Sequence, residues 1–197
     1  MSIDLNRRTI LAILLMAPMF ALMLVVMGCL KVPVGDPDNS TPDAALNGPW
    51  IMRDGDKEQL FLIQGYDKHT HLVRFFNFKR SGDAVDLDNC GAYKGWVTQI
   101  AGVNFLTLQP LPLAEAWGEK EENPVWIVGK YHIDGPSIRY SMIKPDAEMI
   151  KNVATRQEAE AVIAANANNA ALFGDSLAIR KASQDEARQI IGAFKTN

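Results

Sequence analysis

The chain has 197 residues, with 20 lysines and arginines against 23 aspartates and glutamates, so its formal net charge is −3 at pH 7. A mildly acidic chain lacks the basic face that a nucleic-acid-binding protein needs, so no nucleic-acid partner is expected. Its two cysteines, Cys29 and Cys90, are too few for a disulfide-stapled fold, so the fold must rest on a hydrophobic core.

The N-terminus has the pattern of an export signal. Two arginines at 7–8 form a basic head, and an uncharged, strongly apolar run follows over 9–28. The run closes with Val26-Met27-Gly28-Cys29, which resembles a lipobox. The resemblance to bacterial lipoprotein precursors implies that residues 1–28 are a signal peptide. It also implies that Cys29 becomes the lipid-bearing first residue, since several acyl chains hold a protein stably on a bilayer.

The alternative for residues 10–27 is a permanent transmembrane helix, because the run lies just inside the spanning range of roughly 17–25 residues. The basic head and the small Gly28 favour cleavage, and the cysteine directly after Gly28 favours lipidation. We therefore expect a lipid-anchored protein of the bacterial cell envelope that faces the periplasm. Leu30, where an aspartate would favour inner-membrane retention, favours the outer membrane over the inner one.

Lipidation of Cys29 would leave Cys90 without a partner in the chain. Cys90 stands between Asn89 and Gly91 in what resembles a loop. Two interpretations stay open for it. The favoured one is a small, buried apolar residue, and the other is a reactive thiol.

Residues 29–49 have the composition of a linker, with four prolines among glycines and short polar residues. Such a segment buries too little apolar surface to order itself. Behind a lipidated cysteine it predicts a spacer that lifts the folded part off the membrane. The remaining residues, 50–197, are predicted to form a single domain.

From residue 50 to 143 the pattern predicts β-strands. Short apolar runs rich in aromatic and β-branched residues alternate with turn signals such as Asp54-Gly55 and Asp134-Gly135. The predicted strands are 50–52, 60–64, 72–78, 93–100, 103–108, 125–133 and 137–143, with a longer loop over 110–124. An antiparallel meander or barrel-like sheet of about seven strands follows, because closure removes exposed edges.

After Pro145 the pattern becomes helical. Thr155 to Glu158 and Ser183 to Glu186 both have the spacing of a capping box, and each precedes an apolar stripe that needs the sheet to cover it. Residues 177–181 are predicted as a short strand between the two helices. The predicted fold class is therefore α+β, a sheet with C-terminal helices.

One short segment, Gly48-Pro49-Trp50, resembles the Gly-x-Trp start of lipocalin-type barrels. The resemblance implies a barrel in which the side chain of Trp50 closes one end as part of the core. It marks structure more than activity.

Asp67, His69 and His71 occupy alternate positions, which on a strand would place them on one face. They resemble part of a zinc or copper ligand set. His132 belongs to another predicted strand, and no fourth ligand is apparent. Solvated turn histidines are the favoured interpretation, so no metal is predicted.

Six aromatic residues could line a ligand cavity or simply fill a barrel core, and core filling is favoured. They are Phe75, Phe76, Phe78, Trp96, Phe105 and Trp126. Arg74 and Arg139 interrupt apolar strands. They would either serve such a pocket as polar groups or face solvent.

The remaining sequence patterns do not match a known metal-binding or catalytic motif. Asp83, Asp86 and Asp88 cluster in a predicted loop without the spacing of a calcium-binding loop, and Glu121-Glu122 lies in a polar loop. No nucleophile elbow, phosphate-binding glycine loop or local Cys–His pair is present in the sequence. We predict no catalytic residue and no cofactor, and an enzyme is the least favoured class.

Two functional classes remain. The favoured one is a binding or envelope-interaction module that contacts another envelope protein. The other is a carrier of a small apolar ligand in the barrel interior, as in lipocalins. The interior decides between them, because dense packing excludes a carrier, whereas a cavity of ~300 Å³ or more favours one.

Overall fold

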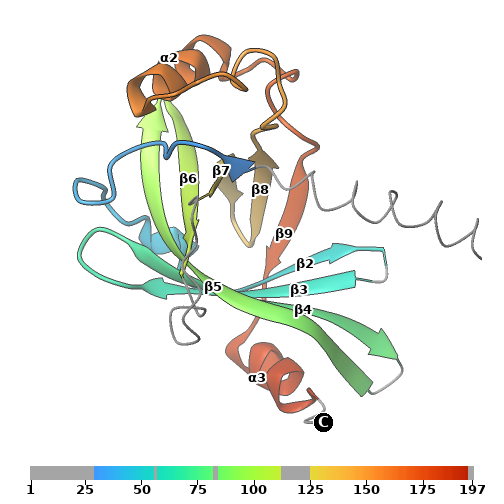
Figure 1. Ribbon diagram of the computed structural model, residues 1–197. Helices are drawn as coiled ribbons and strands as arrows, with labels where there is room; N and C mark the ends of the chain where they lie inside the picture. The colour runs from blue at the N-terminus through green and yellow to red at the C-terminus, as the bar shows by residue number, and fades with distance from the viewer. Residues whose placement is uncertain (1–28, 56, 82–83, 112–124, 195–197) are drawn as a thin grey trace, which may run out of the picture.

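The computed structural model describes residues 29–55, 57–81, 84–111 and 125–194. Within them an antiparallel sheet is accompanied by one short 3-10 helix and two α-helices (Figure 1). The strands are β1 (Cys29–Leu30), β2 (Gly48–Asp54), β3 (Lys57–Gly65), β4 (His71–Ser81), β5 (Ala84–Ile100), β6 (Val103–Pro110), β7 (Trp126–Asp134), β8 (Ser137–Met142) and β9 (Leu177–Lys181). The helices are η2 (Ala44–Leu46), α2 (Arg156–Asn166) and α3 (Gln184–Gly192).

The sheet closes on itself. Its strand order is β1-β7-β6-β5-β4-β3-β2-β9-β8, and an additional pairing of β7 with β8 makes β2 to β9 an eight-stranded antiparallel barrel. The two-residue β1 pairs with the start of β7, where Cys29 lies opposite Ile127. In Figure 1, β2, β3 and β4 lie across the view while β8 and β9 stand steeply to them. The predicted α+β fold with a barrel-like sheet and C-terminal helices is confirmed.

Strand β5 is longer than the sequence indicates. The stretch holding Asp86, Asp88 and Cys90, predicted as a loop, forms its first half and pairs with β4. These turn-type residues are exposed on β5, so they keep their solvation while their backbone completes the sheet. A register shift between Asn77 and Phe78 lets the two strands continue past them. Asp83, Glu121 and Glu122 lie outside the described residues.

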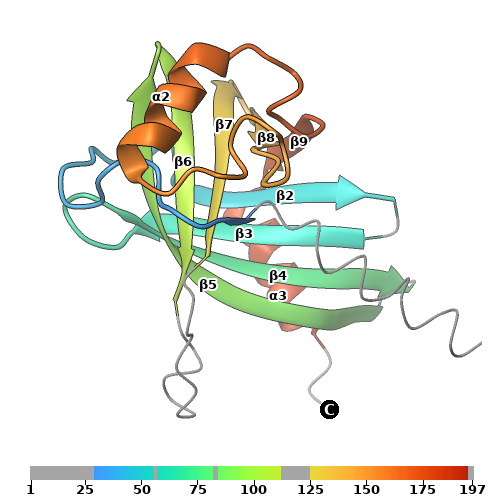
Figure 2. The same cartoon turned by 45° about the horizontal axis from the view of Figure 1, so that its top comes forward.

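Both helices cover outer faces of the barrel, on opposite sides of it (Figures 1 and 2). Helix α3 covers a buried cluster on β2 to β5 that includes Ile51, Leu60 and Phe78. Helix α2 and its flanking loops cover a second cluster that includes Phe105 and Val128. No helix among the residues that the structure describes is long and apolar enough to cross a membrane.

The two predicted capping boxes differ in the structure. At α2, Thr155 accepts from the amide of Glu158 and the Glu158 carboxylate accepts from the amide of Thr155, so this box is confirmed. At α3, the hydroxyl of Ser183 accepts from the amide of Glu186. The Glu186 carboxylate instead accepts from Arg180 of β9 at 2.9 Å, because a charged donor binds it more strongly than a backbone amide.

Residues 30–47, called the N-terminal strap below, pack on the barrel where the sequence predicts a spacer. Val34 is fully buried, and its carbonyl accepts from Trp96 Nε1 at 2.7 Å and from Thr107 Oγ1 at 2.8 Å. The strap ends in η2, whose Leu46 is also buried. The strap turns between residues 36 and 39, and its few apolar side chains are enough to fix it against β5 and β6. The folded part therefore includes the N-terminal strap as well as residues 50 onward.

Candidate functional site: the barrel cavity

The barrel interior holds a cavity of about 460 Å³. Inward-facing side chains from all eight barrel strands line it, and most are apolar. Among them are Phe61, Val73, Leu106, Ile127, Ile138 and Leu177. This volume falls in the range of small-molecule pockets, ~300–1,000 Å³, and far exceeds the small voids of an ordinary protein core. The interior is therefore hollow rather than packed.

Glycines on the inner wall allow two aromatic rings to approach it closely. A Cβ atom on Gly129 would stand 2.5 Å from the ring of Tyr140, and one on Gly91 would stand 2.5 Å from the ring of Phe75. Real Cβ contacts are never this short, so these positions need glycine for close approach. The rings occupy the space of the missing side chains and leave the centre of the barrel open.

One end of the barrel is sealed, and we call it the closed end. Leu46 of η2 and Trp50 of β2 are each 1% exposed, and Trp50 Nε1 donates to the Leu46 carbonyl at 2.7 Å. The Tyr131 hydroxyl donates to Asp43 Oδ2 at 2.9 Å, and burial, helped by that carboxylate, raises the pKa of Tyr131. Trp50 thus closes one end of the barrel, as the Gly-x-Trp resemblance implies.

The other end is polar and reaches solvent, and we call it the mouth. Asp54, Gln59, Asn77 and Asn89 line the cavity there. Asp54 and Asn89 are exposed, and the Asn77 side-chain amide donates to the Asn89 side-chain oxygen. Of the lining residues that the structure describes, Asp54 alone carries a formal charge. The described lining thus offers no cation to hold an anionic ligand.

Two polar atoms on the cavity wall are buried without a hydrogen-bond partner in the described structure, Tyr140 Oη and Asn77 Oδ1. Tyr140 is 9% exposed, and its burial raises the pKa of the hydroxyl. The hydroxyl therefore stays neutral and can donate or accept, whereas the amide oxygen of Asn77 can accept. Unpaired buried polar atoms are costly, and a ligand group that met them would remove that cost.

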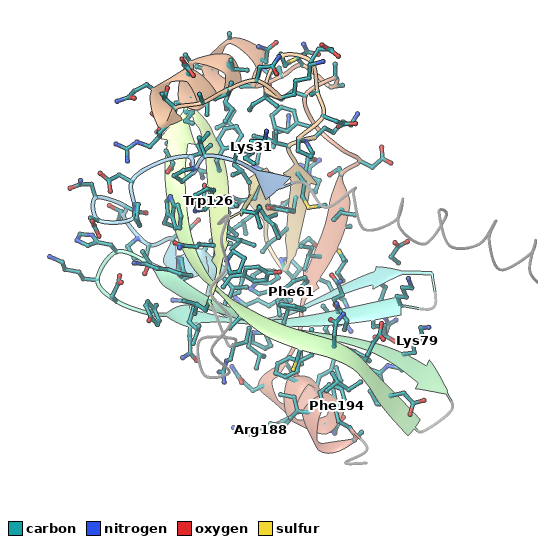
Figure 3. The ribbon with its side chains drawn as sticks, viewed as in Figure 1. Lys31, Phe61, Lys79, Trp126, Arg188 and Phe194 are labelled. Carbon is teal, nitrogen blue, oxygen red and sulfur yellow. The ribbon has the colours of Figure 1, made fainter. Side chains whose placement is uncertain are left out.

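Most of the predicted aromatic candidates lie outside the cavity. Phe75 lines it, but the other five belong to clusters on the outer face of the barrel. Phe76 and Phe78 make tilted ring contacts with Phe194, which follows α3, and Trp96, Phe105 and Trp126 pack under the N-terminal strap and α2. Figure 3 shows Phe61 inside the barrel and Phe194 on the far side of the sheet. Side chains alternate between the two faces of the sheet along each strand, so a residue's position in the strand decides whether it faces the cavity, and its aromatic character does not.

The arginine candidates face solvent. Arg74 and Arg139 are both exposed, and Arg74 donates to Gln64 on the neighbouring strand. Cys90, favoured as buried, is also exposed, because it lies on the outer face of β5 rather than in a loop. None of these three residues lines the cavity.

The histidines do not converge on a ligand set. His69 Nδ1 lies 2.9 Å from the Ser40 carbonyl oxygen, while Asp67 accepts from the backbone amides of His69 and Thr70 and so fixes a turn. His71 is fully buried, and desolvation lowers its pKa. His132 is exposed on β7. Among the described residues, no group of three or more histidines, cysteines and carboxylates is placed to hold a metal ion.

No protein-family model matches this chain, and no curated protein matches its sequence. Among solved structures, it is similar to a DUF4909 family protein from Staphylococcus aureus subsp. aureus Mu50. The identity is 11%, the match covers 72% of this chain and 100% of that chain, and the TM-score is 0.31. A likeness of this size supports no conclusion about fold or function.

Proposed function

We propose that this protein is a carrier that holds a small, largely apolar ligand inside its barrel. The cavity of about 460 Å³ is the observation that supports this proposal, because a barrel whose interior serves only as core fills it with side chains. Apolar walls would supply affinity, and Tyr140 Oη and Asn77 Oδ1 would orient the ligand. With Asp54 as the only charge described in the lining, the suitable ligand is not an anion.

We further propose that the carrier is anchored through a lipidated Cys29 in the bacterial envelope and faces the periplasm. The support is the signal-like N-terminus and its lipobox ending at Gly28-Cys29. Residue 29 also stands directly at the start of the folded part, since Leu30 pairs with Trp126 and is buried.

An uncharged fluorescent probe such as N-phenyl-1-naphthylamine tests the carrier. Protein comprising residues 29–197 should enhance its fluorescence saturably, with one site per chain. Leu177 lines the cavity near the mouth, whereas the next residue, Ala178, is exposed on the outer face of β9. Leu177→Trp fills part of the cavity and should weaken probe binding at least tenfold, while the matched Ala178→Trp should leave it unchanged.

Thermal unfolding of both variants shows whether each still folds. A wild-type protein that binds no probe, or a folded Leu177→Trp protein that binds it as well as wild type, would contradict a ligand-holding interior. Native mass spectrometry of protein from its own cell adds a second readout. A retained small molecule supports the carrier, and a co-purifying protein without one supports the envelope-interaction module instead.

Lipidation is tested separately with a fatty-acid probe in growing cells. Cys29→Ala should abolish labelling and leave an unprocessed precursor, while Cys90→Ala should be labelled and processed like wild type. Labelling of the Cys29→Ala protein would contradict lipidation at Cys29, and it would leave the proposal of a ligand-binding barrel unaffected.

A further inference from the structure

The residue that would carry the anchor lies at the same end of the barrel as the mouth. Neighbouring strands of the barrel alternate in direction, so the first residues of β7 share an end with the last residues of β2. Asp54 ends β2 at the mouth. Cys29 pairs with Ile127 near the start of β7, and the side chain of Ile127 itself lines the cavity.

No flexible linker separates Cys29 from the barrel. Leu30 is 4% exposed and belongs to the buried cluster under α2. Four residues further on, the Val34 carbonyl accepts hydrogen bonds from the Trp96 and Thr107 side chains. A flexible linker would let the domain rotate freely above a membrane, but a strap fixed from residue 30 onward holds the barrel in one orientation relative to its anchor.

From this geometry we infer that the mouth of the barrel faces the bilayer and that the cavity exchanges its ligand directly with the membrane. The inference rests on the proposed anchoring and deepens the proposed carrier. It needs only that the chain enters the membrane immediately before residue 29. A lipidated Cys29 and a retained span over residues 10–27 both satisfy that condition.

The orientation defines the class of ligand. A molecule that enters through a mouth lying on the bilayer is one that partitions into the membrane, such as a lipid with a single acyl chain. Its polar group reaches Asn77 Oδ1 near the mouth and Tyr140 Oη on the wall, both of which lack a partner in the described structure. Transfer through such a contact avoids exposing the apolar chain to water, which is unfavourable for every methylene group of the chain.

Labels at the two ends of the barrel test the orientation in the membrane-anchored protein whose Cys29 carries the lipid, so that Cys29 takes no label. In a Cys90→Ser background, Asp54→Cys places one thiol at the mouth, and Asp134→Cys places another at the opposite end of β7. Both aspartates are exposed, so both thiols accept a fluorescent label. The protein is reconstituted into phosphatidylcholine vesicles that contain a lipid with a nitroxide on its head group.

The label at residue 54 should be quenched at least twofold more strongly than the label at residue 134, with quencher-free vesicles as the control. Equal quenching, stronger quenching at residue 134, or no quenching at either position would overturn the inference. The probe-binding test has an independent outcome. If the protein binds no probe but the label at residue 54 is still quenched more strongly, the proposed ligand-holding cavity is refuted. If the protein binds the probe but the two labels are quenched equally, only the orientation is refuted.

Discussion

The two ends of the barrel are built from the same strands but differ in almost every physical property. On β2, Trp50 is 1% exposed at the closed end whereas Asp54 is exposed at the mouth. On β4, His71 is fully buried whereas Asn77 borders the opening. The closed end is sealed by a hydrogen-bonded plug from η2. Stabilising packing and the opening to solvent are thus separated along the barrel axis rather than between layers.

Such a separation would suit the proposed carrier. A binding site needs unfilled volume and unpaired polar atoms, and both reduce stability. Dense clusters under α2 and α3 and the plug at the closed end offset that cost elsewhere in the molecule. Substitutions at the two ends should therefore change the stability of the protein by different amounts.

Loss of packing at the closed end should destabilise the protein most. Trp50→Ala removes a buried aromatic side chain and its hydrogen bond to the Leu46 carbonyl, so it should lower the free energy of unfolding by ~3–5 kcal/mol. The control is Met52→Ala, two residues nearer the mouth on the same face of β2 and only partly buried, which should cost less than about 2 kcal/mol. Urea unfolding measures both. Equal losses would show that the two ends do not differ in packing.

A smaller effect is expected from the wall between the two ends. Gly129→Ala places a Cβ against the ring of Tyr140 and should destabilise the protein by ~1–3 kcal/mol through overpacking. Tyr140→Leu in the same chain should recover most of that loss because it removes the ring. Gly65→Ala has open space around its Cβ and serves as the control. If Gly129→Ala leaves the free energy of unfolding unchanged, the Tyr140 ring can move into the cavity to make room for the added Cβ.

The smallest effect is a pH dependence at the closed end. Burial lowers the pKa of His71 in the folded protein, so below the unfolded value of about 6.5 the unfolded chain binds more protons than the folded one. Stability from this residue is therefore complete above that pH and falls as the pH drops toward the folded pKa. His71→Gln should flatten the decline in unfolding free energy between pH 7 and 5. His132→Gln, at an exposed position, should leave this decline unchanged. If unfolding free energy falls with pH equally in wild type, His71→Gln and His132→Gln, the assignment to His71 is wrong.

Much of the fold could be predicted because period-2 alternation and turn chemistry are local. The Asp54-Gly55 and Asp134-Gly135 turns stand between the strands they were predicted to separate, and Thr155 caps α2 as expected. The first half of β5 could not be predicted, because Asp86, Asp88 and Gly91 carry turn preferences that only the pairing with β4 overrides.

The site was harder to predict than the fold. Choosing aromatic residues by type found Phe75 but missed Phe61 and Tyr140, because the side of the sheet depends on register, which no single strand reveals. The N-terminal strap was missed for a related reason. Its composition indicates a spacer, and only the hydrogen bonds that the distant Trp96 and Thr107 side chains donate to the Val34 carbonyl make it part of the domain.

The N-terminal strap also sets an order on folding. Val34 bonds to residues 62 and 73 positions later in the chain, and the amide of Gly35 donates to Glu160, 125 positions later. Contacts of such sequence separation form slowly, because the loop entropy must be overcome before they contribute. The strap, although it comes first in the chain, is therefore the last described segment to dock onto the barrel.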